Sequence, residues 1–123
     1  MAINRSSAIF ERGFVTYSNA AKTDMLGVFP DTLAAHGAVS EQVAREMALG
    51  ARRLAGADVA VAISGIAGPG GGSAEKPVGL VHFGLATADG ARHLERRFAE
   101  GDRQAIRLAA TEQALNLLLE GLA

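Results

Sequence analysis

Residues 59–63 read VAVAI, an uninterrupted apolar run that is typical of a strand covered on both faces. The run leads into SGIAGPGGGSAEKP at residues 64–77, where the many glycines predict a loop. In open α/β sheets, binding sites gather at the carboxyl ends of parallel strands, so this loop is a candidate site. The segments on either side of VAVAI predict the remaining elements.

Downstream, the sequence predicts a hairpin and a final helix. Residues 78–87 form a long strand, Ala88-Asp89-Gly90 gives a turn signal, and residues 91–98 return as a partly exposed strand. Asp102 is placed to cap the last helix. The apolar side of this helix carries Ile106, Ala109, Ala110, Ala114, Leu117 and Leu118.

Upstream, capping residues and glycines mark the ends of further helices. Asn19 can cap a short helix over residues 20–26, and a second short helix over residues 32–36 closes at a glycine. Ser40 caps a longer helix that stops at Gly56. The apolar face of the longer helix consists of Val43, Met47, Ala51 and Leu54, which recur at helical spacing.

Residues 13–18 read GFVTYS, and their β-branched and aromatic content predicts a first strand. The order is then strand, helices, strand, hairpin and helix, which indicates an α/β domain with helices on both faces of a mixed sheet. If the first strand and VAVAI are parallel neighbours, the segments that follow them open on the same edge of the sheet.

The composition points to one domain, residues 1–123, and excludes several classes of protein. The net charge is −1, so the chain lacks the basic surface of a nucleic-acid-binding protein. The sequence has no cysteine, and its histidines at positions 36, 82 and 93 lack metal-ligand spacing. We assign them structural roles and expect neither a metal nor a cofactor. No apolar run approaches the roughly 18 residues of a membrane span, and a cytoplasmic location fits these features.

The segment from Ser7 to Lys22 places a serine hydroxyl and a lysine amine on either side of the predicted first strand. A lysine whose pKa is lowered by burial can take the proton of a serine nucleophile. Each residue also has an ordinary interpretation. Lys22 is then a solvated charge, Ser7 a loop residue or helix cap, and Tyr17 a core or edge tyrosine. The residues alone leave both interpretations open.

The glycine-rich loop could cradle a phosphate or an oxyanion with its backbone N–H groups. Its sequence matches neither the P-loop nor the dinucleotide fingerprint, so it does not favour a nucleoside triphosphate. An ordinary flexible connection is the alternative. Arg103, just inside the last helix, would suit a phosphate through its planar guanidinium, or it is a solvated or ion-paired surface residue.

Three runs carry a family resemblance: FERGFVTYSNAAKTDMLGV at residues 10–28, HGAVSEQVA at residues 36–44 and SGIAGPGGGSAEKPVGLVHF at residues 64–83. Together with GDR at residues 101–103, they resemble the CinA carboxy-terminal family, the nicotinamide-nucleotide amidohydrolases. The resemblance extends from Ser6 to the end of the chain. It implies a three-layer α/β/α sandwich with a mixed, mostly parallel sheet.

The resemblance also implies an activity. The family hydrolyses nicotinamide mononucleotide to nicotinate mononucleotide and ammonia, in pyridine nucleotide salvage, by a serine–lysine mechanism without a metal. Ser7 matches the family's nucleophile, and Lys22, in the YSN-x-x-K motif, matches its base. Tyr17 of the same motif matches a group that assists at the nucleophile or in the proton relay.

The substrate-binding residues implied by the resemblance lie around the glycine-rich loop. Ser64 matches the residue that opens this loop in the family, and Arg103 matches the arginine of the GDR turn; both would contact the substrate. With them we expect Gly65 and Gly68 of the loop to bind the small nucleotide substrate.

The family's earlier helix, strand and ESCTGG-type loop have no counterpart here, and Asn4 and Arg5 replace the Pro-Gly that precedes its serine pair. We therefore expect an N-terminally truncated domain whose first strand pairs with VAVAI, pairs with another subunit, or leaves the chain poorly ordered. Two functions follow: an amidohydrolase, or a non-catalytic remnant or oligomerising module of the same family. In either case we expect a homo-oligomer that binds neither nucleic acid nor a membrane.

Overall fold

The computed structural model describes residues 10–98 and 102–122 of the chain. In this part, the sheet has the order β1-β2-β3, formed by β1 (Ala60–Gly65), β2 (Leu80–Thr87) and β3 (Gly90–Arg97). Both neighbouring pairs are antiparallel. The predicted hairpin is thus confirmed, and the prediction of a mostly parallel sheet is wrong for the described strands. The reason lies in the connections: the glycine-rich loop joins β1 to β2 without the crossover helix that a parallel pair requires.

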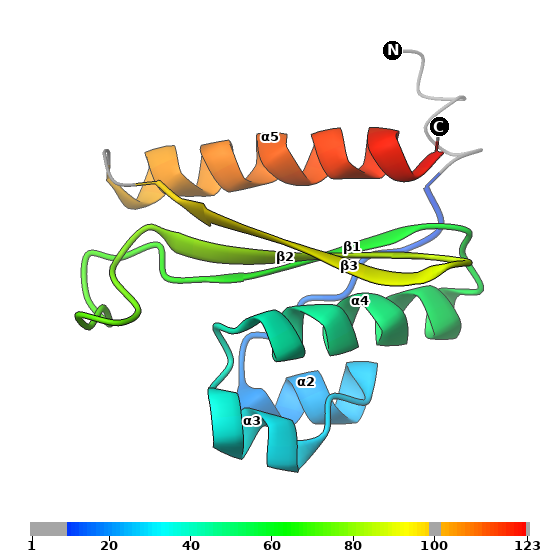
Figure 1. Cartoon of the computed structure of the whole chain (residues 1–123), viewed down its shortest axis with the longest axis horizontal. Helices are drawn as coiled ribbons and strands as arrows, with labels where there is room; N and C mark the ends of the chain where they lie inside the picture. The colour runs from blue at the N-terminus through cyan, green and yellow to red at the C-terminus, as the bar shows by residue number, and fades with distance from the viewer. Residues whose placement is uncertain (1–9, 99–101, 123) are drawn as a thin grey trace.

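Helices cover both faces of the sheet (Figure 1). On one face lies α5 (Arg103–Leu122), and on the other lies α4 (Glu41–Ala55), with α2 (Asn19–Leu26) and α3 (Pro30–His36) packed on the outer side of α4. The two faces have separate apolar clusters, one between the sheet and α4 and one between the sheet and α5. The predicted α/β class is confirmed.

The helix termini follow the capping residues closely. The Ser18 side chain, rather than that of Asn19, caps α2 by accepting a hydrogen bond of 3.0 Å from the Ala21 N–H. Ser40 and Asp102 accept the corresponding bonds at the starts of α4 and α5, as predicted. At the opposite ends, α2, α3 and α4 have the C-cap residues Gly27, Gly37 and Gly56, respectively.

Residues 13–18 form no strand, so the prediction of a first strand there is wrong. A strand exists only through hydrogen bonds to a neighbour, and no described strand pairs with this segment. Val15 and Tyr17 project into solvent, and two of the segment's carbonyl groups bind Lys22 instead. The prediction that the segments after residues 13–18 and after VAVAI lie at the same edge of a parallel sheet is therefore also wrong.

Close packing of α4 against the sheet depends on a glycine in β2. A Cβ atom at Gly84 would overlap the carbonyl oxygen of Ala44 in α4. The predicted buried face of α4 is right for Val43 and Met47 and wrong for Leu54, which is largely exposed. Similarly, β1 is not covered on both faces along its whole length, because Ile63 remains exposed.

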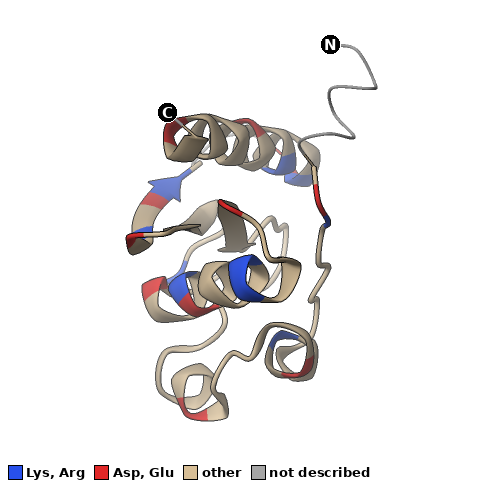
Figure 2. Cartoon of the chain, turned by 90° about the vertical axis from the view of Figure 1, so that its right-hand side faces the viewer, with Lys and Arg blue, Asp and Glu red and all other residues tan. Residues whose placement is uncertain are grey.

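The surface charge is mixed. On the side of the molecule shown in Figure 2, acidic and basic residues alternate over the helices rather than gathering into one patch. Within residues 10–98 and 102–122, none of the helices combines the length and the apolar character needed to cross a bilayer.

Candidate active site

Lys22 lies in the first turns of α2 and is only 6% exposed. Its Nζ donates hydrogen bonds to the backbone carbonyl oxygens of Thr16, at 2.6 Å, and Tyr17, at 3.2 Å. These acceptors belong to the irregular segment immediately before the helix, so the chain folds back on itself to surround the amine. The ordinary interpretation of Lys22 as a solvated surface charge is therefore wrong.

Burial lowers the pKa of Lys22 below its ordinary value of 10.5, because an ammonium group loses hydration inside the protein. Among the described residues, no carboxylate forms an ion pair with it. Its acceptors are neutral carbonyl groups, which offer the ammonium form less stabilisation than a carboxylate would. The site thus moves Lys22 toward the neutral amine, which is the form that can accept a proton.

Tyr17 and Ser7 are the other residues predicted to act together with Lys22. Tyr17 contributes its backbone carbonyl to the lysine, while its side chain is 90% exposed and points away from the core. Its predicted part in the proton relay stays a prediction. Ser7, the predicted nucleophile, lies outside the described residues.

Ser64 lies near the end of β1 and is buried. Its hydroxyl donates a hydrogen bond of 2.6 Å to the carbonyl oxygen of Ala38, in the segment between α3 and α4. This contact ties the start of the glycine-rich loop to the start of α4. The serine hydroxyl keeps its own acceptor lone pairs, which can receive a bond from a ligand.

The surroundings of Gly65 and Gly68 leave no room for a side chain at either position. A Cβ atom on Gly65 would approach Val81 Cγ2 to 2.8 Å, and one on Gly68 would approach Val78 Cγ1 to 2.5 Å. Gly68 also has a φ of +80°, which favours glycine. The Gly68 carbonyl accepts a hydrogen bond of 3.0 Å from Nη1 of Arg103 at the start of α5. Arg103 therefore holds the loop and leaves its remaining N–H donors for other partners.

The structure thus brings Ser64, Gly65, Gly68 and Arg103 together around one loop and places Lys22 in a separate environment, within α2. No hydrogen bond or ion pair between described residues joins the two groups. Within the described part of the chain, no cluster of three or more His, Asp or Glu side chains is placed to hold a metal ion.

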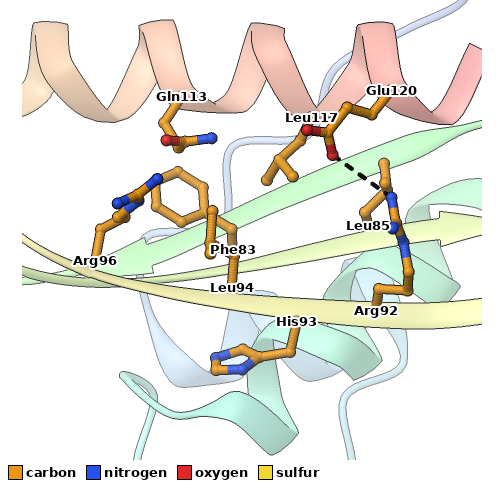
Figure 3. A pocket seen from close by; sticks show the side chains of 9 residues that line it. All are labelled: Phe83, Leu85, Arg92, His93, Leu94, Arg96, Gln113, Leu117 and Glu120. Atoms are coloured by element: carbon orange, nitrogen blue, oxygen red, sulfur yellow. Dashed lines mark ion pairs between the residues drawn. The ribbon is translucent and has the colours of Figure 1, made fainter.

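Two hollows on the surface of the described residues lie apart from Lys22. One, of about 250 Å³, lies between the hairpin and α5, where apolar side chains such as Phe83 and Leu117 form the floor and Arg92, Arg96 and Glu120 the rim (Figure 3). The other, of about 310 Å³, lies beside the first turn of α4. Neither is lined by the residues predicted to bind substrate.

Sequence reasoning missed Thr16 and Ala38, whose backbone carbonyls hold Lys22 and Ser64. Main-chain acceptors leave no trace in residue type, so no sequence signal identifies them. It also missed the contact between His82 and His93, which the predicted hairpin could have indicated because its turn fixes which positions lie across from each other.

The chain is similar to known proteins over nearly its whole length. A family model described as the CinA C-terminal domain matches residues 1–122. A protein of Enterobacter agglomerans named nicotinamide-nucleotide amidohydrolase PncC is 60% identical over 114 residues, which are 93% of this chain and 70% of the relative. The protein of the same name from Escherichia coli K12 is 62% identical over 113 residues, 92% of this chain and 68% of the relative.

Solved structures agree with these relatives. The crystal structure of the competence/damage inducible protein CihA from Agrobacterium tumefaciens superposes with a TM-score of 0.94 at 52% identity, covering 98% of this chain and 74% of that one. The family model, the identity to these relatives and this superposition lead to the same assignment: the chain belongs to the CinA C-terminal domain family.

Proposed function

We propose that this chain is an amidohydrolase that converts nicotinamide mononucleotide to nicotinate mononucleotide and ammonia, with Ser7 as nucleophile and Lys22 as general base. The observation that carries the proposal is the buried Lys22 amine, whose Nζ is bonded to two backbone carbonyls. The name of the relatives in Enterobacter agglomerans and Escherichia coli supports the choice of substrate. The reaction releases ammonia for reuse and leaves a nicotinate nucleotide, which suits a salvage step in the cytoplasm.

The hydrogen bonds of Lys22 fit a neutral amine. An uncharged lysine amine has two N–H donors and one lone pair, whereas the ammonium form has three donors and none. The carbonyls of Thr16 and Tyr17 account for two donors. The lone pair of the neutral form then remains free to accept the proton of a hydroxyl group.

The proposed reaction follows from this arrangement. Lys22 takes the proton of the Ser7 hydroxyl, and the serine oxygen attacks the amide carbon. The tetrahedral intermediate collapses when the Lys22 ammonium protonates the leaving nitrogen, so ammonia departs and an acyl-enzyme remains. Water, deprotonated by Lys22, then cleaves the ester to give the carboxylate and restore Ser7. The Tyr17 hydroxyl would assist at the nucleophile or in the proton relay.

The loop residues would bind the nucleotide. Arg103 retains N–H donors beyond the one that holds Gly68, and a guanidinium group binds phosphate in bidentate fashion. Ser64 donates its own hydrogen to Ala38, so it can accept a hydrogen bond from a ribose hydroxyl, and the backbone of Gly65 and Gly68 would contact the ligand. Backbone N–H groups of this loop would also stabilise the oxyanion.

The test is ammonia release from nicotinamide mononucleotide by the purified chain. Ser7→Ala and Lys22→Met should each reduce kcat by about 10²–10⁴-fold, the usual contribution of such a group. Ser6→Ala is the matched control, because it removes the neighbouring hydroxyl and should leave turnover unchanged. Equal activity in the Lys22→Met variant would refute the proposed base.

A second candidate is a non-catalytic, oligomerising module, and α5 favours it. Its outward face carries Leu108, Leu115, Leu119 and Leu122, which are 63%, 57%, 67% and 56% exposed. Exposed leucines in one helical stripe are typical of a surface that packs against another chain. A folded sample that assembles into oligomers but releases no ammonia would support this second function over the first.

A further inference from the structure

The imidazole rings of His82 in β2 and His93 in β3 are in direct contact on the α4 side of the sheet. Nδ1 of His82 and Nε2 of His93 are 2.8 Å apart, and the rings stack with their centroids 5.0 Å apart. His82 is buried. One ring must donate the shared hydrogen and the other must accept it.

The outer nitrogens of this pair each face a carboxylate. Nε2 of His82 lies 3.9 Å from Glu95 Oε1, and Nδ1 of His93 lies 3.7 Å from Glu41 Oε1. The four side chains therefore form a row, from Glu41 in the first turn of α4, through His93 and His82, to Glu95 in β3. The row connects α4 with both strands of the hairpin.

Further charges surround the row from each neighbouring element. Arg45 of α4 bonds Glu41 at 2.9 Å, and Arg97 of β3 approaches Glu95 at 3.4 Å. Lys76, at the end of the glycine-rich loop, lines the same hollow as His82, together with Glu75 and with His36 of α3. Burial, followed by the proximity of His93, lowers the pKa of His82, which favours its neutral form.

The number of protons on the two rings decides whether every ring nitrogen in the row has a suitable hydrogen-bond partner. If each ring carries one proton, the shared bond leaves one outer nitrogen without a hydrogen, and its lone pair faces a carboxylate. One additional proton gives both outer nitrogens an N–H, and each then points at Glu41 or Glu95. A second additional proton would place two N–H groups against each other between the rings.

We propose that the His82–His93 pair is a proton-controlled latch, which fastens the first turn of α4 to the β2–β3 hairpin when the pair carries one additional proton. His82 is neutral, accepts through Nδ1 and donates from Nε2 toward Glu95. The additional proton lies on Nδ1 of His93, toward Glu41. The latch lies next to Ser64, which pairs with His82 across β1 and β2. It requires no catalytic activity of the chain.

The sign of the pH dependence follows from proton binding. The carboxylates of Glu41 and Glu95 face the outer nitrogens and would favour the additional proton in the folded state, so the stabilisation that they give is lost as the pH rises and the proton leaves. At lower pH the unfolded chain binds two protons on these residues while the folded pair accepts only one, so stability falls again. The contribution of the latch therefore passes through a maximum within the range of about pH 5–8 in which histidine titrates.

The experiment combines nitrogen NMR of the imidazole rings with urea unfolding over this range. We expect His82 to remain in the Nε2–H form while Nδ1 of His93 gains a proton, and the urea midpoint to show the maximum. Glu41→Gln and His93→Gln should flatten the pH dependence of the midpoint, while His36→Gln should keep it. Two rings that titrate independently with mixed tautomers, or a Glu41→Gln midpoint with the wild-type pH dependence, would overturn the latch. The NMR titration of the unmodified chain decides the matter even if a variant fails to fold.

Discussion

The two faces of the sheet carry different kinds of side chain. On the α4 face, Gly84 allows close approach of the helix. Ser64 and His82 are buried there, His93 is half-buried, and all three have hydrogen-bond partners. On the α5 face, Phe83 and Leu85 form an apolar layer that still leaves a hollow of about 250 Å³ (Figure 3). Polar groups are buried where main-chain carbonyls and carboxylates can satisfy them, and the opposite face contributes apolar burial.

The largest expected effect concerns Lys22 in α2, the helix that packs on α4 at the side of the sheet away from α5 (Figure 1). Because only the neutral amine accepts a proton, ammonia release should fall about tenfold per pH unit below the pKa of Lys22. Burial lowers this pKa, so the decline should begin below 10.5. The measurement is kcat as a function of pH, with nicotinamide mononucleotide at saturation.

A matched variant separates the lysine from the histidine pair. His82→Gln removes an imidazole whose pKa is also lowered by burial, and it should leave the low-pH decline of kcat where it is. A decline that disappears in His82→Gln would assign the titrating group to the histidines and contradict the role of Lys22.

A smaller effect tests the packing on the two faces. Gly84→Ala adds one methyl group against the Ala44 carbonyl and should lower the free energy of unfolding by about 1–3 kcal/mol. Gln113→Leu adds apolar volume to the hollow beside α5, and should leave stability unchanged or raise it by about 1 kcal/mol. Urea unfolding of both variants gives the comparison. Equal losses would show that the α5 face is packed as tightly as the α4 face.

The smallest effect is expected at the rim of the same hollow. Arg92 and Glu120 form an ion pair of 3.6 Å in which both side chains are mostly exposed. Such pairs contribute little because water screens them, so Arg92→Ala should change the free energy of unfolding by less than about 1 kcal/mol. A larger loss, measured by urea unfolding, would indicate that the arginine stem covers the apolar floor and that the α5 face depends on its rim.

The helices and the hairpin could be predicted because their signals are local. Ser40, Gly56 and Asp102 act within a few residues of their own positions, and the Ala88-Asp89-Gly90 signal fixes a turn. The sheet direction could not be predicted from VAVAI, because a continuous apolar run fits a buried strand of either direction. The prediction of a strand at residues 13–18 is wrong for a related reason. β-branched residues favour a strand, but a strand also needs a neighbouring strand to supply its hydrogen bonds.

The candidate site was predictable only in part. The glycine-rich loop and Arg103 are predicted to bind the substrate, which stays a prediction, and the structure places the two in contact. The burial of Lys22 was not predictable from composition, because its partners are main-chain carbonyls brought close by the fold. The paired histidines lie eleven positions apart, a separation that acquires meaning only once the register of β2 and β3 is known.

The way Lys22 is held has a consequence for how this segment can change during evolution. Every residue type carries a backbone carbonyl, so mutation at Thr16 or Tyr17 leaves the acceptors for the lysine in place. The number of residues between them and Lys22 is a different matter, since a deletion or insertion would move the carbonyls out of reach. For the hydrogen bonds of the amine, natural selection therefore acts on the number of residues in this connection rather than on their types.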